Sequence, residues 1–157
     1  MDILDFAIKM ELDGEKYYLA LANENKANSL YEVFIALAKD EANHANAIKA
    51  KKAGQDSASA EGPNATIKNV FGEGADFQFA GQKPAQVSVY REAQEKEKES
   101  IALYKKLTEE QTDADGFFAF LIAEEEEHYQ ILDEIVKAVA RPEEWVESAE
   151  FGLREEY

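Results

Sequence analysis

The sequence predicts an all-α protein built as a bundle of four long helices. Four long stretches of the chain carry apolar residues at helical spacing, and the pattern of the first two stretches recurs in the last two. A chain of 157 residues can form a hydrophobic core without disulfides, and this one has no cysteine. We therefore expect one domain that spans residues 1–157.

The first two helices should form a hairpin. Residues 2–26 have an amphipathic pattern, and Asp2 is a suitable N-cap. The second stretch opens with Ser29 and, three residues later, Glu32, which has the form of a capping box. Its apolar stripe continues to Gly54, where the second helix should end.

Helical periodicity lapses between residues 54 and 84, where small, polar and glycine residues surround a few phenylalanines. We interpret this segment as a crossover connection, with a short helix near residues 66–71. Two helical hairpins joined by one long crossover make up the ferritin-like form of the four-helix bundle. The sequence therefore predicts a ferritin-like fold.

The third helix should run from about residue 85 to residue 110. Thr112 with Asp115 predicts the start of the fourth helix, which should last until Arg141 because Pro142 follows. The remaining residues, 142–157, then form a short C-terminal extension. Its apolar side chains should pack on the bundle or on a partner, which favours a homodimer; they are Trp145, Val146, Phe151 and Leu153.

Both histidines of the chain follow a glutamate by three residues, in the pairs Glu41–His44 and Glu125–His128. Residues three apart lie on one face of a helix, so each pair can direct a carboxylate and an imidazole to one point. A single pair on an acidic helix could arise by chance. Two pairs in matching apolar frames predict a site for metal ions.

The repeat supplies two further carboxylates. The pattern Ala-x3-Glu-x2-small-x3-Tyr places Glu11 in the first helix where Glu97 lies in the third. Together with the two pairs they give the ligand pattern of di-iron and di-manganese carboxylate proteins. We expect two iron ions per chain, with manganese as the alternative, because without cysteine the ligands are oxygen and imidazole nitrogen. The predicted metal ligands are Glu11, Glu41, His44, Glu97, Glu125 and His128.

Four more residues are candidates for supporting these ligands. Tyr18 and Tyr104 each lie about two helical turns after Glu11 or Glu97, and each is either a core aromatic or a hydrogen-bond donor to a metal-bound carboxylate. Asp40 and Glu124 directly precede the motif glutamates and could accept the second ring N–H of a histidine across the bundle.

The formal net charge of −16 argues against nucleic-acid binding, because phosphate contacts need a basic surface. Most of the glutamates simply solvate helix faces. The sequence shows no signal peptide, and no apolar run approaches the roughly 20 residues that cross a bilayer. We expect a cytoplasmic protein that binds neither nucleic acid nor membrane.

The motif residues resemble the diiron domain of rubrerythrin and its ferritin-like relatives over residues 1 to about 140. The resemblance implies that the motif glutamates Glu41 and Glu125 bridge the irons, and that the other four ligands bind terminally. The sequence lacks the four cysteines of a rubredoxin domain, so electrons should come from an external donor such as a rubredoxin-type protein. Ser100 stands where rubrerythrins place a further glutamate.

These features predict a non-haem diiron oxidoreductase that reduces peroxide or dioxygen and acts in oxidative stress or iron redox chemistry. Two alternatives stay open. One is a ferroxidase or iron-binding protein without catalytic turnover, and the other is a bundle that its metal site merely stabilises. Turnover with a reductant separates the first function from the others.

Overall fold

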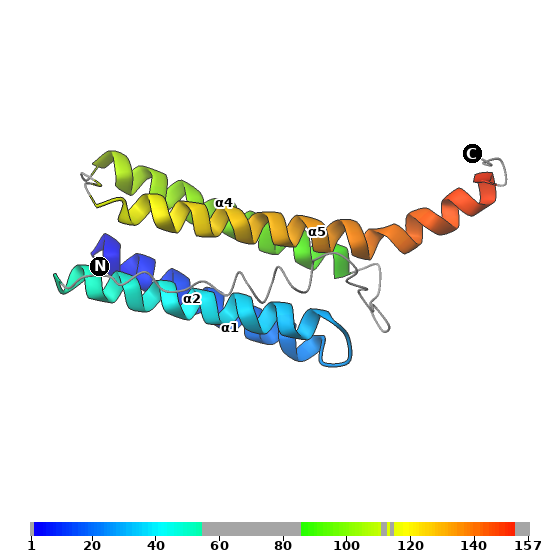
Figure 1. Ribbon diagram of the computed structural model, residues 1–157, viewed down its shortest axis with the longest axis horizontal. Coiled ribbons are helices and arrows are strands. Elements are labelled where there is room, and N and C mark those ends of the chain that lie inside the picture. The colour runs from blue at the N-terminus through cyan, green and yellow to red at the C-terminus, as the bar shows by residue number, and fades with distance from the viewer. Residues whose placement is uncertain (1, 55–85, 111–112, 114, 153–157) are drawn as a thin grey trace. The chain divides into compact units, whose positions relative to one another are not determined.

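The computed structural model describes residues 2–54, 86–110, 113 and 115–152, and for residues 86 and 141–152 it describes the backbone alone. All regular secondary structure in these ranges is helical, so the predicted all-α class is confirmed (Figure 1). The helices are α1 (Ile3–Glu24), α2 (Leu30–Lys52), α4 (Gln86–Glu110) and α5 (Phe117–Gly152). The short helix expected near residues 66–71, and nearly all of the predicted crossover, lie outside the described residues.

The chain divides into two compact units. The first comprises Met1–Gly81 and Asp113–Leu121, and so holds α1, α2 and the first turn of α5. The second comprises Gln82–Thr112 and Ile122–Tyr157, and so holds α4 and the rest of α5.

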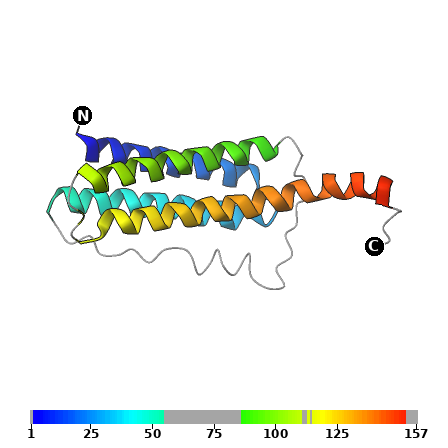
Figure 2. The same cartoon turned by 90° about the horizontal axis from the view of Figure 1, so that it is seen from above.

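In the first unit α1 and α2 form the predicted antiparallel hairpin (Figure 2). Asp2 caps α1 as expected, because its carboxylate accepts a hydrogen bond from the backbone N–H of Leu4 at 3.0 Å. The turn is ordered by Asn25, which is buried and donates from Nδ2 to the carbonyl of Leu21 at 2.7 Å.

The capping box predicted at Ser29 is wrong. The backbone of Ser29 is already helical (φ −64°, ψ −18°), and its side chain makes no cap hydrogen bond. An N-cap side chain reaches the first turn from an extended backbone, which Ser29 does not have. Asn28 takes this role instead, since its Oδ1 accepts from the N–H of Leu30 at 2.8 Å.

The start of α5 also differs from the prediction, because the helix begins at Phe117 and two aspartates cap it. Asp115 accepts from the N–H of Phe117 at 3.1 Å, and Asp113 accepts from the N–H groups of Phe118 at 2.9 Å and Ala119 at 3.1 Å. Thr112 lies outside the described residues.

Lys51, near the end of α2, contacts a capping carboxylate and an aromatic ring at the start of α5. The Nζ of Lys51 lies 2.8 Å from Asp115 and 5.3 Å from the centre of the Phe117 ring. Its hydrogen bond lowers the pKa of Asp115 below the usual value, so the carboxylate that accepts from the helix N-terminus stays charged.

In the second unit α4 and α5 are held together by polar as well as apolar contacts. Gln94 on α4 is buried and donates from Nε2 to Asp133 on α5 at 3.3 Å. Large apolar side chains fill the buried faces of both helices; they include Tyr90, Tyr104, Leu107, Leu132 and Ile135.

The expectation that the fourth helix ends at Arg141 is wrong, since α5 continues through Pro142 to Gly152. Proline lacks the N–H that would bond the carbonyl of Ala138, but its ring fixes φ near the helical value. The residue therefore weakens a helix without forbidding it. No helix among the described residues is both long and apolar enough to span a bilayer.

Candidate metal centre

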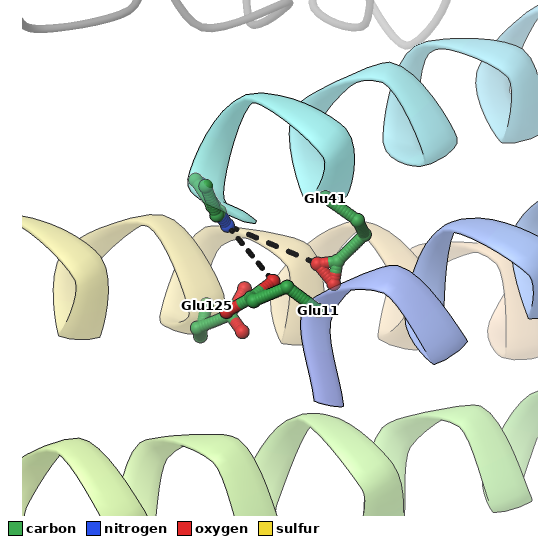
Figure 3. A group of neighbouring side chains, drawn as sticks. Glu11, Glu41 and Glu125 are labelled. Atoms are coloured by element: carbon green, nitrogen blue, oxygen red, sulfur yellow. Dashed lines mark hydrogen bonds and ion pairs between the residues drawn. The ribbon is translucent and has the colours of Figure 1, made fainter. Parts of the chain in front are cut away.

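The first unit gathers three of the predicted ligands into one buried triad. Nδ1 of His44 on α2 lies 3.4 Å from Oε1 of Glu11 on α1 and 3.8 Å from Oε2 of Glu41, one turn earlier on α2 (Figure 3). The three residues are between 1% and 4% exposed. A potential ligand atom from each lies within 4.8 Å of the others, which is close enough for one cation to bind all three.

Local helix geometry explains two of the three residues of this triad. Glu41 and His44 share a face of α2 because they are three residues apart. Glu11 joins them from the facing helix, on the side of α1 that also buries Ala7 and Tyr18. The hairpin thus brings the Glu41–His44 motif and Glu11, which is distant in the sequence, into one cluster.

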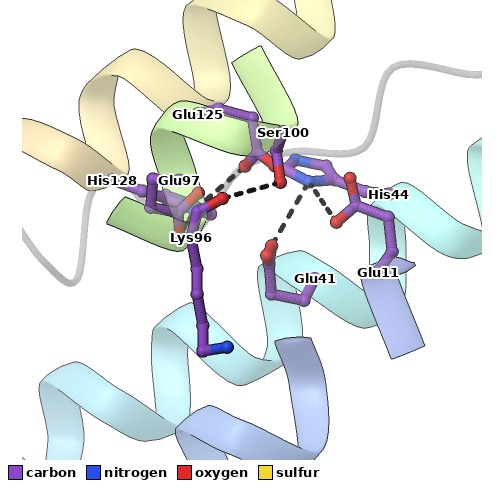
Figure 4. A network of polar contacts seen from close by, with 8 residues as sticks. All are labelled: Glu11, Glu41, His44, Lys96, Glu97, Ser100, Glu125 and His128. Carbon is purple, nitrogen blue, oxygen red and sulfur yellow. Dashed lines mark hydrogen bonds and ion pairs between the residues drawn. The ribbon is translucent and has the colours of Figure 1, made fainter. Parts of the chain in front are cut away.

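The second unit repeats the arrangement with the other three predicted ligands. Nδ1 of His128 on α5 lies 3.3 Å from Oε2 of Glu97 on α4 and 3.2 Å from Oε1 of Glu125 (Figure 4). Their exposed fractions do not exceed 3%. Here too the potential ligand atoms lie within 4.8 Å of one another.

The two triads share one geometry. In each, an imidazole presents Nδ1 to a carboxylate of its own helix and to a carboxylate of the neighbouring helix. Nδ1 would therefore be the ligand nitrogen in both, and Nε2 is left for contacts outside the triad. Each triad offers two carboxylates and one imidazole, a donor set that suits divalent iron or manganese.

The charges of the buried groups also fit a bound cation. Among the described residues no lysine or arginine is buried, although the first unit buries the carboxyl groups of Glu11, Asp40 and Glu41 beside a single histidine. Carboxylates that share a desolvated space repel one another and are costly unless a cation neutralises them. Divalent metal ions would supply that charge.

The structure tests the predictions for the four supporting residues only in part. Asp40 is buried and offers an oxygen within 4.8 Å of a nitrogen of His44, one turn later on its own helix. Its predicted partner was a histidine across the bundle, and that pairing remains a prediction, as does the corresponding role of Glu124.

The two tyrosines are buried, as core aromatics would be. Tyr18 is 3% exposed and stacks on Phe34, with 6.2 Å between the ring centres and 12° between the planes. Tyr104 is fully buried. Whether either hydroxyl donates to a metal-bound carboxylate stays a prediction.

The sequence did not single out Gly14, which lies against the carboxylate of Glu41. The signal that could have identified it is the small residue of the repeat, three positions after Glu11.

Fold and site together define a class: an all-α protein that buries carboxylate and imidazole groups able to bind metal ions. The family model named Rubrerythrin matches residues 2–136, so the chain belongs to the rubrerythrin family. This confirms the resemblance and the ferritin-like four-helix-bundle fold. Membership implies iron binding, with the two triads as candidate ligands. Comparisons with curated proteins and with solved structures found no match.

Proposed function

We propose that this protein is a non-haem diiron oxidoreductase that reduces peroxide, or dioxygen, with electrons from an external donor. The observation that carries the proposal is the pair of buried triads with identical donors and matching geometry, in a chain of the rubrerythrin family. In ferritin-like di-iron proteins four helices direct such residues to one centre. The proposed ligands are Glu11, Glu41, His44, Glu97, Glu125 and His128.

The chain's own part in this chemistry is electrostatic. Four carboxylates offset the charge of two divalent cations, and the two imidazoles complete the donor set without adding charge. Burial keeps bulk water from the triads, which strengthens the attraction between the carboxylates and the metal ions. Bound there, two ferrous ions would supply the two electrons that convert one peroxide and two protons into two waters.

We propose that an external donor then returns the electrons, since these 157 residues contain no cysteine that could hold an iron–sulfur or rubredoxin-type centre. A rubredoxin-type protein is the donor we propose. We further propose that the protein works in the cytoplasm, as a homodimer, without nucleic acid or membrane.

A second function, ferroxidase or iron-binding protein, is favoured by one observation. Ser100 occupies the position of the additional rubrerythrin glutamate, and its hydroxyl donates to the backbone carbonyl of Lys96 at 3.2 Å. It therefore offers no carboxylate to a metal ion. A site without this ligand is closer to a ferroxidase centre.

The proposal is tested first by metal analysis of protein purified without added metal, which should show two iron ions per chain. The protein is then incubated anaerobically with an excess of a chemical reductant, and peroxide is added in many-fold excess over protein. Continued consumption of reductant and peroxide supports the oxidoreductase. A single turnover with retention of more than two irons per chain would establish iron handling instead, and bound metal without any oxidation would leave only a stabilising role.

A further inference from the structure

A glycine in the interior of α1 lies directly against one of the proposed ligands. A Cβ added at Gly14 would be 3.0 Å from Oε1 of Glu41, 3.3 Å from its Cδ and 3.5 Å from its Cγ. Figure 3 shows the Glu41 carboxylate pointing towards α1. The Glu41 side chain therefore packs directly against α1 at Gly14, which has no side chain.

The backbone does not need glycine at this position. Among the described residues, glycines with positive φ are Gly54 and Gly116, and Gly14 has ordinary helical geometry. Glycine is also the least favourable residue in a helix interior apart from proline. What glycine provides here is space, and Glu41 occupies it.

We propose that Gly14 is a positioning residue that lets the Glu41 carboxylate lie against α1 and so fixes where the first triad can bind a metal ion. The proposal rests on the proposed function, because it takes Glu41 as a ligand. Even a methyl group at residue 14 would meet Oε1 more tightly than most side chains pack, so the carboxylate would have to shift by a few tenths of an ångström. It is held 3.8 Å from Nδ1 of His44, and a shift would change the spacing of the two donors.

The equivalent position of the second unit is a serine and not a glycine. Ser100 lies three residues after Glu97, as Gly14 lies three residues after Glu11, and it carries a side chain in that position. Its hydroxyl is turned back to Lys96 of its own helix. The equivalent position of the second unit therefore already carries a Cβ, and Ser100 gives a matched control for a substitution at Gly14.

The test compares Gly14→Ala with Ser100→Ala by anaerobic titration with Co²⁺, followed by visible absorption. Gly14→Ala should weaken the binding of one of the two ions by up to about 10-fold, the lower end of the range seen when the orientation of a ligand is disturbed, because the carboxylate shifts by only a few tenths of an ångström, and it should alter the Co²⁺ spectrum. Ser100→Ala should retain the wild-type affinity and spectrum. Wild-type behaviour of Gly14→Ala in both measurements would overturn the proposal.

A second measurement separates this inference from the proposed function and from simple misfolding. In metal-free protein, Gly14→Ala should raise the melting temperature when Glu41 is also replaced by Ala, because the contact is gone and alanine favours the helix. With Glu41 present the gain should vanish or reverse. Equal gains in both backgrounds would show that Gly14 does not constrain Glu41. If the wild type bound no Co²⁺, the proposed function would fail, while this comparison would still decide whether Gly14 positions the carboxylate.

Discussion

Nδ1 of His128 lies 3.3 Å from Oε2 of Glu97, a contact between α5 and α4 that brings together two buried groups distant in the sequence. The hairpin of α1 and α2 reproduces it with His44 and Glu11 at 3.4 Å. Each histidine is thus the group on which the carboxylates of its triad converge. This relationship makes the histidines the most informative residues to replace.

We predict that each chain binds two divalent metal ions and that replacing both His44 and His128 by Ala abolishes high-affinity binding. The imidazoles are the only nitrogen donors of the triads, and their loss also opens the packing around the carboxylates. Metal content after dialysis, measured by mass spectrometry, checks the stoichiometry. A double variant that still held two irons would show that the ligand set is wrong.

We predict opposite effects of Glu125→Gln on metal-free and metal-loaded protein. Glu125 is fully buried, and Gln removes the buried charge while its amide oxygen can still accept from His128, which should stabilise metal-free protein by about 1 kcal/mol. The same change removes a ligand and should weaken metal binding. Urea unfolding with a chelator and with added Fe²⁺ measures both effects. Glu126→Gln is the matched control because Glu126 is the next residue and is exposed, so it should change neither quantity. A Glu125→Gln variant that lost stability without metal would contradict the electrostatic argument.

We predict that truncation after Arg141 converts a homodimer into a monomer. The truncation removes the last part of α5 and, with the remaining C-terminal residues, the apolar side chains of Trp145, Val146, Phe151 and Leu153. Loss of the packing that we expect for these side chains should also lower the melting temperature, by roughly 2–4 °C for each kcal/mol lost. Light scattering gives the mass in solution. An unchanged mass and melting temperature would show the segment to be dispensable.

We predict that peroxide oxidises the diferrous protein faster than dioxygen does. Two ferrous ions hold two electrons, which match one peroxide, whereas full reduction of dioxygen to water needs four. Stopped-flow mixing of anaerobic protein with equal concentrations of each oxidant, followed by ferric absorbance, tests this. Close to one peroxide should be consumed per site. Faster oxidation by dioxygen with release of peroxide would place the protein among ferroxidases.

We predict that Ser100→Glu shifts the preference further towards peroxide. The variant restores a carboxylate at the position of the additional rubrerythrin glutamate, where it can bind the more positive diferric site. The ratio of the two oxidation rates is the measurement, and Ser100→Gln, which adds the same bulk without charge, is the control. Equal ratios in wild type, Ser100→Gln and Ser100→Glu would mean that the missing glutamate does not set the choice of oxidant.

The sequence by itself determined which residues carry the chemistry and which helices hold them. Helical periodicity and the Glu-x-x-His spacing are local properties, because residues three apart share a helix face in any fold. The repeat identified Glu11 and Glu97 as further ligands, because the two glutamates occupy the same position in matching residue patterns. These signals predicted the four helices, the six candidate ligands and the family.

Only the tertiary structure decided where helices begin and end and how closely they pack. At these points the local sequence allows more than one arrangement of similar energy. Asn28 rather than Ser29 caps α2, because the backbone of the turn is set by the packing of the hairpin. Helix α5 passes Pro142, since one lost hydrogen bond does not end a helix by itself. The contact of Gly14 with Glu41 depends on how closely α1 approaches α2. A distance between helices follows from many side chains packing at once, and no spacing along the chain encodes it.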